Sequence, residues 1–206
     1  MIIVDVEASG IDTNKNSILS IGAFDFDNPK NQFYEECKIW EGSHINKDAL
    51  AVNGFTEEQI ENSQKQSDTE LVKHFIKWAL TCHEHTFVGQ NPSFDRDFIH
   101  MTAQRAHLDW PFAFRTIDQH SLCFMHMIKK GITPPISNNR TDLNSDKIMK
   151  YVGIPVEPHP HNALNGAKFA GEAISRLLYD RKLLLEFDKY PIPWIQNADE
   201  IQMYTD

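Results

Sequence analysis

Two acidic side chains stand one residue apart at the end of an apolar segment near the N-terminus. Residues 2–10 read IIVDVEASG, in which Asp5 and Glu7 follow residues typical of a buried strand. Because side chains alternate across a strand, both carboxylates project to the same side of it. Near a low-dielectric core they repel each other, and one takes up a proton unless a cation holds the pair. The pair therefore predicts a cation site, with the alternative that both side chains emerge into solvent at the strand end.

Two later stretches contain residues that could complete such a site. GQNPSFDRDF (89–98) places Asp95 in the first turn of a helix, where, for this stretch taken alone, the helix dipole or an ion pair with Arg96 explains the acid better than metal binding does. PHPHNALNGAK (158–168) places His161 immediately before the start of the last helix. An isolated His in such a loop is more often a surface residue than a catalyst. His159, in the same stretch, is a candidate for such a surface residue. Only the combination of these stretches indicates chemistry.

The composition indicates one folded domain of acidic character. The chain has 206 residues, of which 41% are hydrophobic and 24% are charged, which suits one domain with a sizeable core. Its formal net charge is −9, whereas proteins that coat nucleic acid non-specifically are usually basic. A polyanionic substrate would therefore have to be met by a local patch or by bound cations.

Cysteine usage and the N-terminal residues predict a cytoplasmic protein. Cys37, Cys82 and Cys123 are far apart in the sequence and form no CxxC motif, which is typical of buried thiols in a reducing compartment. An acid at residue 5 argues against a signal peptide. No apolar run approaches the length of a membrane span, so no membrane association is expected.

The order of the expected elements predicts an α/β fold in which helices cover a mixed sheet. Strands are expected at 2–7, 18–27 and 31–40, joined in a meander with a turn at 28–30, and a further strand at 85–90. Helices are expected at 46–52, 56–62, 67–80, 93–108, 143–152 and 162–180, and a brief strand leads into another helix within 115–129. Thr56 with Gln59 forms a capping box, Asn162 is the expected N-cap of the last helix, and residues 130–141 are expected to form a loop.

Taken in order, the motifs resemble those of the DEDDh 3′→5′ exonuclease family. Asp-x-Glu on a first strand, Asn-x-x-x-Asp at a later helix start and His-x-Ala near a last helix occur between residue 2 and about residue 180. The intermediate stretches ILSIGAF, NGFTEEQI, RTIDQHSL with Asp118, and YVGIP extend the likeness. The resemblance implies a ribonuclease H-like (exonuclease) fold, a mixed central sheet with helices on both faces. It implies an exonuclease domain over residues 1–180, followed by a tail over residues 181–206 that packs on the domain or on a partner.

The resemblance also implies roles for individual residues. Asp5 would bridge two divalent ions, Mg²⁺ or Mn²⁺, Glu7 would bind the ion on the nucleophile side, and Asp95 would hold the other directly or through water. His161 would be the general base that takes a proton from the attacking water. Substrate contacts are expected from Ala8, Ser9 and Gly10 through backbone amides, from Phe55 beside the terminal base, and from Asn91 of the second motif. Core packing explains Phe94 better than base contact does.

The sequence departs from the family pattern at the fourth acid. The family motif has Asp five residues after the His, and this chain has Gly166 there. Asn165 is neutral, and Glu172 lies roughly 240° further around the helix. The absent ligand normally holds the ion on the nucleophile side, so binding of that ion is expected to be weakened. Three carboxylates and one phosphodiester balance two divalent ions, which predicts cooperative binding of metal and substrate, with water or the Asn165 amide oxygen in the vacant position and better activity with Mn²⁺.

Three functions are consistent with these residues. The first is an active exonuclease acting on nucleic acid with a free 3′ end. The second is a 3′-end-binding protein whose catalysis is impaired by the natural or engineered Gly166, and the third is a regulatory scaffold that touches no nucleic acid. The intact acids and His161 favour the first. The sequence leaves open DNA or RNA, single or double strands, and a homodimer, for which YPIPWI (190–195) could supply a surface unless it packs on its own domain.

Overall fold

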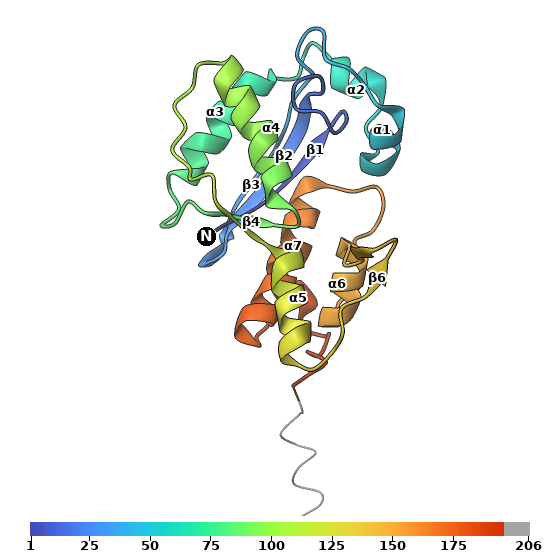
Figure 1. Cartoon of the computed structure of the whole chain (residues 1–206). Helices are drawn as coiled ribbons and strands as arrows, with labels where there is room; N and C mark the ends of the chain where they lie inside the picture. The colour runs from blue at the N-terminus through green and yellow to red at the C-terminus, as the bar shows by residue number, and fades with distance from the viewer. Residues whose placement is uncertain (196–206) are drawn as a thin grey trace, which may run out of the picture.

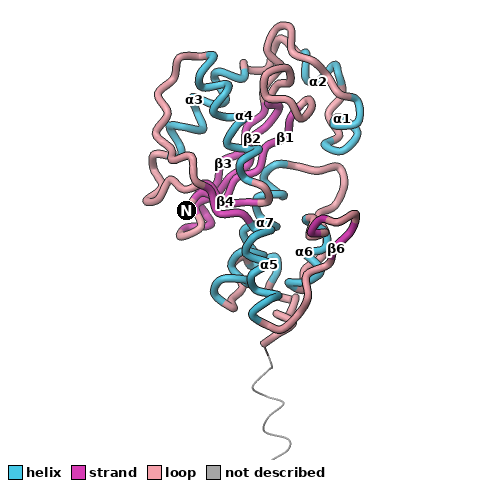
Figure 2. The backbone as a smooth tube through the Cα atoms, in the orientation of Figure 1, coloured by secondary structure: helices cyan, strands magenta, loops and turns pink. Residues whose placement is uncertain are grey.

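The centre of the protein is a mixed five-stranded sheet. The structure is a computed structural model that describes residues 1–195. The strands are β1 (Ile2–Ala8), β2 (Ile18–Asp25), β3 (Asn28–Glu36), β4 (Phe87–Gly89) and β5 (Thr116–Asp118), in the spatial order β3-β2-β1-β4-β5. Figures 1 and 2 show the strands β1 to β4 of this sheet. β1, β2 and β3 pair antiparallel, whereas β1, β4 and β5 pair parallel. The predicted mixed sheet is confirmed, and the ends of β1 and β4 meet at the same edge.

Helices cover both faces of this sheet. They are α1 (Lys47–Asn53), α2 (Glu57–Glu61), α3 (Asp68–Ala79), α4 (Pro92–Arg105), α5 (Gln119–Lys129), α6 (Ser145–Val152) and α7 (Ala163–Tyr179), with a short 3-10 turn at Leu185–Phe187. α3 and α4 pack on one face, and α7 packs on the other beside α5 and α6 (Figure 1). Among the described residues, no helix is long and apolar enough to cross a membrane.

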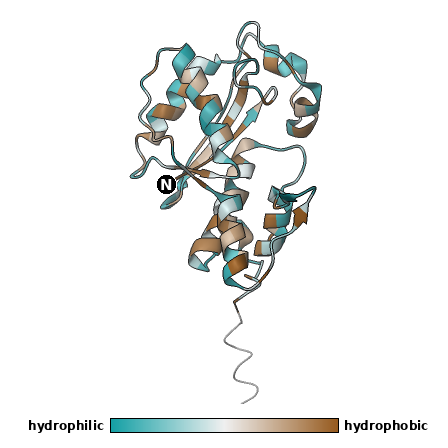
Figure 3. Ribbon diagram, in the orientation of Figure 1, coloured by the Kyte–Doolittle hydropathy of each residue, from teal (hydrophilic) through white to brown (hydrophobic). Residues whose placement is uncertain are grey.

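The alternation of side chains along β1 decides which residues face which layer. Ile2, Val4 and Val6 belong to the core that packs against α3 and α4. Ile3 instead packs with Ala167 and Ala170 of α7. Figure 3 shows hydrophobic segments along α5 and α7, in keeping with a second core between these helices. Asp5 and Glu7 follow Ile3 by two and four residues, so their side chains point to the same side of the strand as Ile3. Both acids therefore lie on the face that packs against α7.

A glycine in β2 brings the start of α7 onto the sheet next to Asp5. Gly22 is the register partner of Asp5. A Cβ atom at Gly22 would lie 2.0 Å from the backbone nitrogen of Leu164, so no side chain fits there. The side chain of Asn162 caps the helix by accepting from the amides of Leu164 and Asn165, as predicted. The first turn of α7 therefore lies directly over the strand pair that contains Asp5.

A buried ion pair joins α7 to the segment that follows it. Glu172 and Arg176 are both fully buried, with 2.7 Å between Glu172 Oε1 and Arg176 Nε. The remaining Arg176 nitrogens donate to the carbonyls of Val152, Phe187, Tyr190 and Pro191. Glu172 Oε2 accepts from the amides of Leu183 and Leu184. These bonds hold the segment from Leu183 to Pro191 against α7, and residues 196–206 of the predicted tail lie outside the described residues.

Two turns differ from the sequence-based expectation. The β2–β3 turn is at residues 26–27, where the carboxylate of Asp25 accepts from the amide of Asp27 at 3.1 Å, and β3 then runs over 28–36 instead of 31–40. Pro29 fits inside this strand because β3 is at the sheet edge. The expected loop 130–141 contains a small hairpin, β6 (Ile136–Ser137) and β7 (Arg140–Thr141), joined by two Asn residues with positive φ.

Candidate active site

The paired acids of β1 line a cavity at the sheet edge. Asp5 and Glu7 are partly buried and face this cavity, whose volume is about 200 Å³. The polar residues that line it are Asp5, Glu7, Gln90, Ser145, Glu157 and His161, and Gly166 of α7 lies among them. The two acids therefore do not simply emerge into solvent, which was the alternative to a cation site.

Asp95 is a buried acid next to this pair. It is 2% exposed and lies in the first turn of α4, which follows β4 directly. Arg96 does not neutralise it, since the Arg96 guanidinium pairs with Asp97 at 2.7 Å. The Asp95 charge acts on Asp5, which places the two carboxylates near each other. The ion-pair alternative for Asp95 is therefore removed.

The turn before α4 is held by Asp118 at the end of β5. Asn91 has a left-handed backbone with φ of 52°, and its amide donates to the Asp118 carboxylate at 3.0 Å. The Asn91 side chain is exposed and accepts from the Ser93 hydroxyl. Asp118, found by sequence as a motif residue, thus fixes how the chain turns toward Asp95.

The acids of the site make one another harder to ionise. Burial raises the pKa of Asp5 well above its ordinary value, and the charges of Asp95, Glu7 and Glu157 raise it further. Burial and then Glu157 raise the pKa of Glu7 to about 7, against a hydrogen bond from Asn53 that lowers it. Burial also raises the pKa of Asp95. Bound divalent cations would offset this mutual repulsion.

His161 lies between this cavity and a second one. The second cavity, also about 200 Å³, is lined by His161 together with Tyr34, Glu36, Asn53, Phe55 and Gln59 among others. The His161 amide donates to the carbonyl of Val52 at 3.1 Å. The ring of His159 stacks on that of His161 with centroids 4.5 Å apart, so His159 supports the orientation of its neighbour. The backbone of His161 is thus held by Val52 and its imidazole by stacking on His159.

The two aromatic candidates have different surroundings. Phe55 lines the second cavity, and the Lys65 ammonium lies 5.1 Å from its ring centroid. Phe94 packs on Phe98 with ring centroids 4.8 Å apart and borders the main core. Phe94 therefore packs in the core as expected, and base contact by Phe55 stays a prediction.

Asn53, which sequence reasoning did not single out, connects α1 to the end of β1. Its side chain is buried, donates to the carbonyl of Ala8 at 3.1 Å and accepts from the amide of Phe55 at 3.2 Å. It stands in the NGFTEEQI stretch that contributed to the resemblance, and that stretch was the available signal. Asn53 therefore links the acid strand to the second cavity.

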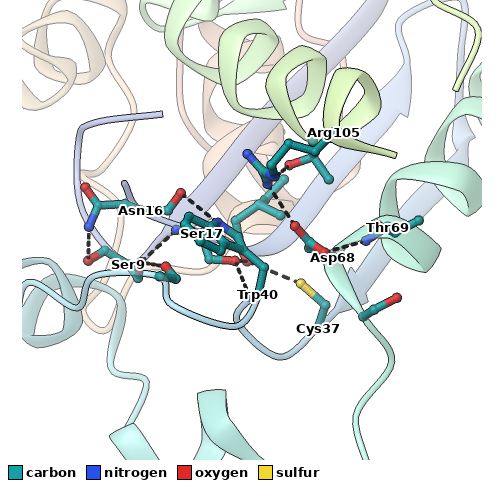
Figure 4. Close-up of polar contacts among 12 residues, drawn as sticks. Ser9, Asn16, Ser17, Cys37, Trp40, Asp68, Thr69 and Arg105 are labelled. Atoms are coloured by element: carbon teal, nitrogen blue, oxygen red, sulfur yellow. Dashed lines mark hydrogen bonds and ion pairs between the residues drawn. The ribbon is translucent and has the colours of Figure 1, made fainter. Parts of the chain in front are cut away.

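The loop after β1 is fixed by an internal network (Figure 4). The amide of Ser9 donates to the carbonyl of Ser17 at 2.8 Å, and Ser9 is fully buried. The Ser9 hydroxyl accepts from the amide of Ser17 and donates to the carbonyl of His44, and the Asn16 side chain donates to that same carbonyl. The Ser9 amide is therefore occupied inside the protein in this conformation, while Ala8 and Gly10 stay predicted substrate contacts.

The position of the absent fourth acid is filled by another acid. A Cβ at Gly166 would lie 2.3 Å from Asp5 Oδ2, so the carboxylate of Asp5 occupies the space that a side chain at residue 166 would enter. Asn165 is exposed, and Glu172 is buried in its pair with Arg176 away from the cavity. Glu172 is therefore not placed to replace the missing ligand, and the role of the Asn165 amide oxygen stays a prediction.

The residues facing the cavity have the chemistry that a hard cation requires. Within residues 1–195, no three His, Cys, Asp or Glu side chains are arranged to hold an ion in this conformation, so binding would require side-chain rotation. The donor set nevertheless fits, because the site is lined by carboxylates and by Gln90, whose buried Oε1 has no hydrogen-bond partner in the described part of the chain. Oxygen donors of this kind are the ligands of Mg²⁺ and Mn²⁺.

Comparisons with known proteins find relatives in sequence over half of the chain. No family model matches the chain. Ribonuclease T of Haemophilus influenzae is 28% identical over 120 residues, which cover 50% of this chain and 51% of the relative. The chain thus aligns with about half the length of the curated relatives it matches.

Solved structures match over most of the chain. The nuclease domain of 3′hExo, a DEDDh family member bound to rAMP, has a TM-score of 0.65 at 16% identity, covering 89% of this chain and 93% of that one. Escherichia coli exonuclease I in complex with a dA16 oligonucleotide has a TM-score of 0.67 at 16% identity, covering 87% of this chain and 40% of that one. These likenesses confirm the predicted resemblance: the chain has the ribonuclease H-like fold of the DEDDh exonucleases, with sequence similarity to ribonuclease T over half of its length.

Proposed function

We propose that this protein is a metal-dependent 3′→5′ exonuclease that hydrolyses phosphodiester bonds at the 3′ end of DNA or RNA. One observation carries the proposal: Asp5, Glu7 and His161 come from distant parts of the chain to line one cavity, with the buried Asp95 beside them. The similarity to ribonuclease T and the fold of the DEDDh exonucleases support the same reaction class. A cytoplasmic location and a homodimer stay predictions from the sequence.

The residues of the site have different roles: three acids hold the metal ions, His161 is the general base, and Asn53 positions the end of β1. Asp5, Glu7 and Asp95 would hold two Mg²⁺ or Mn²⁺ ions, which when bound activate the attacking water and stabilise the departing 3′ oxygen. His161 takes the proton of the attacking water, and its stacking on His159 holds the ring ready for this transfer. The connection of Asn53 to Ala8 keeps the end of β1 in place while the acids act.

The second cavity is the proposed binding site of the terminal nucleotide. It adjoins the acids through His161, and its Phe55 ring offers an apolar face on which any base can stack. Lys65 stands next to this ring, and its ammonium pairs at 2.5 Å with the carboxylate of Glu36, which lines the same cavity. The backbone of Ala8 and Gly10 would meet the last phosphate, and the exposed Asn91 would add a further substrate contact.

The test is degradation of 3′-labelled and 5′-labelled single-stranded DNA and RNA with Mg²⁺, Mn²⁺ or EDTA. We expect trimming from the 3′ end that EDTA abolishes. Asp95→Asn should lower the rate about 100-fold or more, since altering even the outer-shell partners of a bound ion costs 10- to 100-fold. Asp97→Asn is the matched control, because this acid is two residues away on the same helix and pairs with Arg96 at the surface. It should trim like the unaltered protein.

Two outcomes would contradict the proposal. Equal loss in the Asp95 and Asp97 variants would show that the effect is not specific to the cavity. Tight binding of 3′ ends without trimming under any metal would instead favour the alternative of a binding protein impaired at Gly166.

A further inference from the structure

A fourth carboxylate lines the cavity of the candidate active site. Glu157 belongs to the segment 153–162, the orange loop that joins α6 to α7 in Figure 1, and its partly buried side chain faces the same cavity as Asp5 and Glu7. Its charge is near enough to both strand acids to help raise the pKa of each. Glu157 thus adds an acid to the site from an element that carries no family acid motif.

The hydrogen bonding of Glu157 leaves part of its carboxylate free. Glu157 Oε1 accepts from the amide of Asn162 at 3.3 Å, which fixes the side chain beside the start of α7. Its other oxygen, Oε2, has no hydrogen bond within residues 1–195, and no Lys or Arg in that part of the chain pairs with the carboxylate. Capping of the helix start explains the first oxygen. It does not explain why the Glu157 side chain lines the same cavity as Asp5 and Glu7.

The space around Gly166 explains why the acid comes from this loop. The Asp5 carboxylate lies where a side chain at residue 166 would begin, so α7 has no room for an acid there while Asp5 keeps its present rotamer. The segment 153–162 reaches the same cavity next to Glu7 and His161 without this conflict. The missing charge can therefore be supplied from the loop instead of the helix.

We propose that Glu157 is the fourth carboxylate ligand of the metal site, binding the ion that Glu7 binds. This inference rests on the proposed metal-dependent function. It assigns the place of the absent Asp to a residue nine positions before Gly166 in the sequence. A carboxylate there would counter the weakening of the nucleophile-side ion that Gly166 alone implies.

The test is binding of Mn²⁺ alone to the full-length protein, measured by electron paramagnetic resonance and by calorimetry. Glu157→Gln keeps the size of the side chain and an oxygen that can accept from Asn162, but it removes the charge. We expect its Mn²⁺ affinity to fall about tenfold or more, with the metal-free melting temperature unchanged or higher because repulsion among the acids is reduced. Glu41→Gln removes the same charge from an exposed residue and should bind Mn²⁺ like the unaltered chain.

The comparison with Asp5→Asn separates two kinds of failure. If Asp5→Asn loses Mn²⁺ but Glu157→Gln binds it normally, the metal site stands and Glu157 is only a helix cap. If the unaltered chain and Asp5→Asn bind equally weakly, the cavity holds no metal, and the proposed function falls together with this inference. If Glu157→Gln folds poorly, Glu157→Ala and Glu157→Asp replace it, since the first removes the charge and the second keeps it. Glu157→Asp should bind Mn²⁺ more tightly than Glu157→Ala, and equal affinities in these two variants would overturn the proposal.

Discussion

Replacing Glu172 by Gln tests whether this acid is structural or belongs to the metal site. Glu172 is fully buried, and its carboxylate accepts three hydrogen bonds, from Arg176 Nε at 2.7 Å and from the amides of Leu183 and Leu184. The Gln variant leaves the buried Arg176 charge without its counter-ion. Its amide NH₂ can also no longer accept from one of these donors. Breaking a buried pair on one side costs about 3–5 kcal/mol, and the lost hydrogen bond falls within that range.

The assay is urea unfolding followed by circular dichroism, together with Mn²⁺ binding to the folded protein. With a slope of about 2–3 kcal/mol per molar, a loss of about 4 kcal/mol lowers the urea midpoint by about 1.5–2 M. Glu186→Gln is the control, because Glu186 forms an exposed pair with Lys168 at 3.4 Å and should lose less than about 1 kcal/mol. A small stability loss in Glu172→Gln, or a fall in its Mn²⁺ affinity while it stays folded, would refute the structural role.

Three further changes test the geometry around the acids. Folding raises the pKa of Glu7 from 4.5 to about 7. The contribution of Glu7 to stability is therefore complete below pH 4.5 and is lost as the pH rises through 7. The melting temperature of the metal-free protein should fall between these pH values, and it should fall less in Glu7→Gln. Gly166→Ala should weaken Mn²⁺ binding several-fold, because the added Cβ displaces the Asp5 carboxylate. Helix propensity alone favours Ala by about 1 kcal/mol, so the loss is expected in metal binding and not in helix stability. An unchanged Mn²⁺ affinity by calorimetry would contradict this contact. Asn53→Ala should lower the free energy of unfolding, measured in urea, by about 1–3 kcal/mol, because the Ala8 carbonyl loses its buried donor. The same variant should slow 3′ trimming. Normal trimming would show that Asn53 does not position β1.

The sequence was sufficient to predict the parts of the site that depend on local periodicity. Alternation along β1 placed Asp5 and Glu7 on one face, and the structure puts both in one cavity. Capping chemistry also predicted helix starts, since Thr56 forms the expected capping box with Gln59 and Asn162 caps α7. These predictions succeed because the determining contacts lie within a few residues of one another.

Contacts between distant segments could not be predicted in this way. Nothing near Asn53 in the sequence indicates that its side chain reaches the carbonyl of Ala8, which lies on another element. The commitment of the Ser9 amide to Ser17 depends on how the whole loop folds back. The β2–β3 turn was misplaced because Pro29 reads as a turn residue, and only the edge position of β3 makes it acceptable in a strand.

The charge balance of the site links the missing acid at Gly166 to the order in which metal and substrate bind. Two divalent ions bring four positive charges, and Asp5, Glu7 and Asp95 bring three negative ones, so three carboxylates alone require the substrate phosphate for neutrality. Glu157 adds the fourth negative charge at the same cavity, which allows both ions to bind before the nucleic acid arrives. The unaltered protein should then show similar Mn²⁺ affinity with and without a non-hydrolysable oligonucleotide, whereas Glu157→Gln should bind Mn²⁺ tightly only in its presence. Strong dependence on the oligonucleotide in the unaltered protein would mean that Glu157 does not carry the fourth charge.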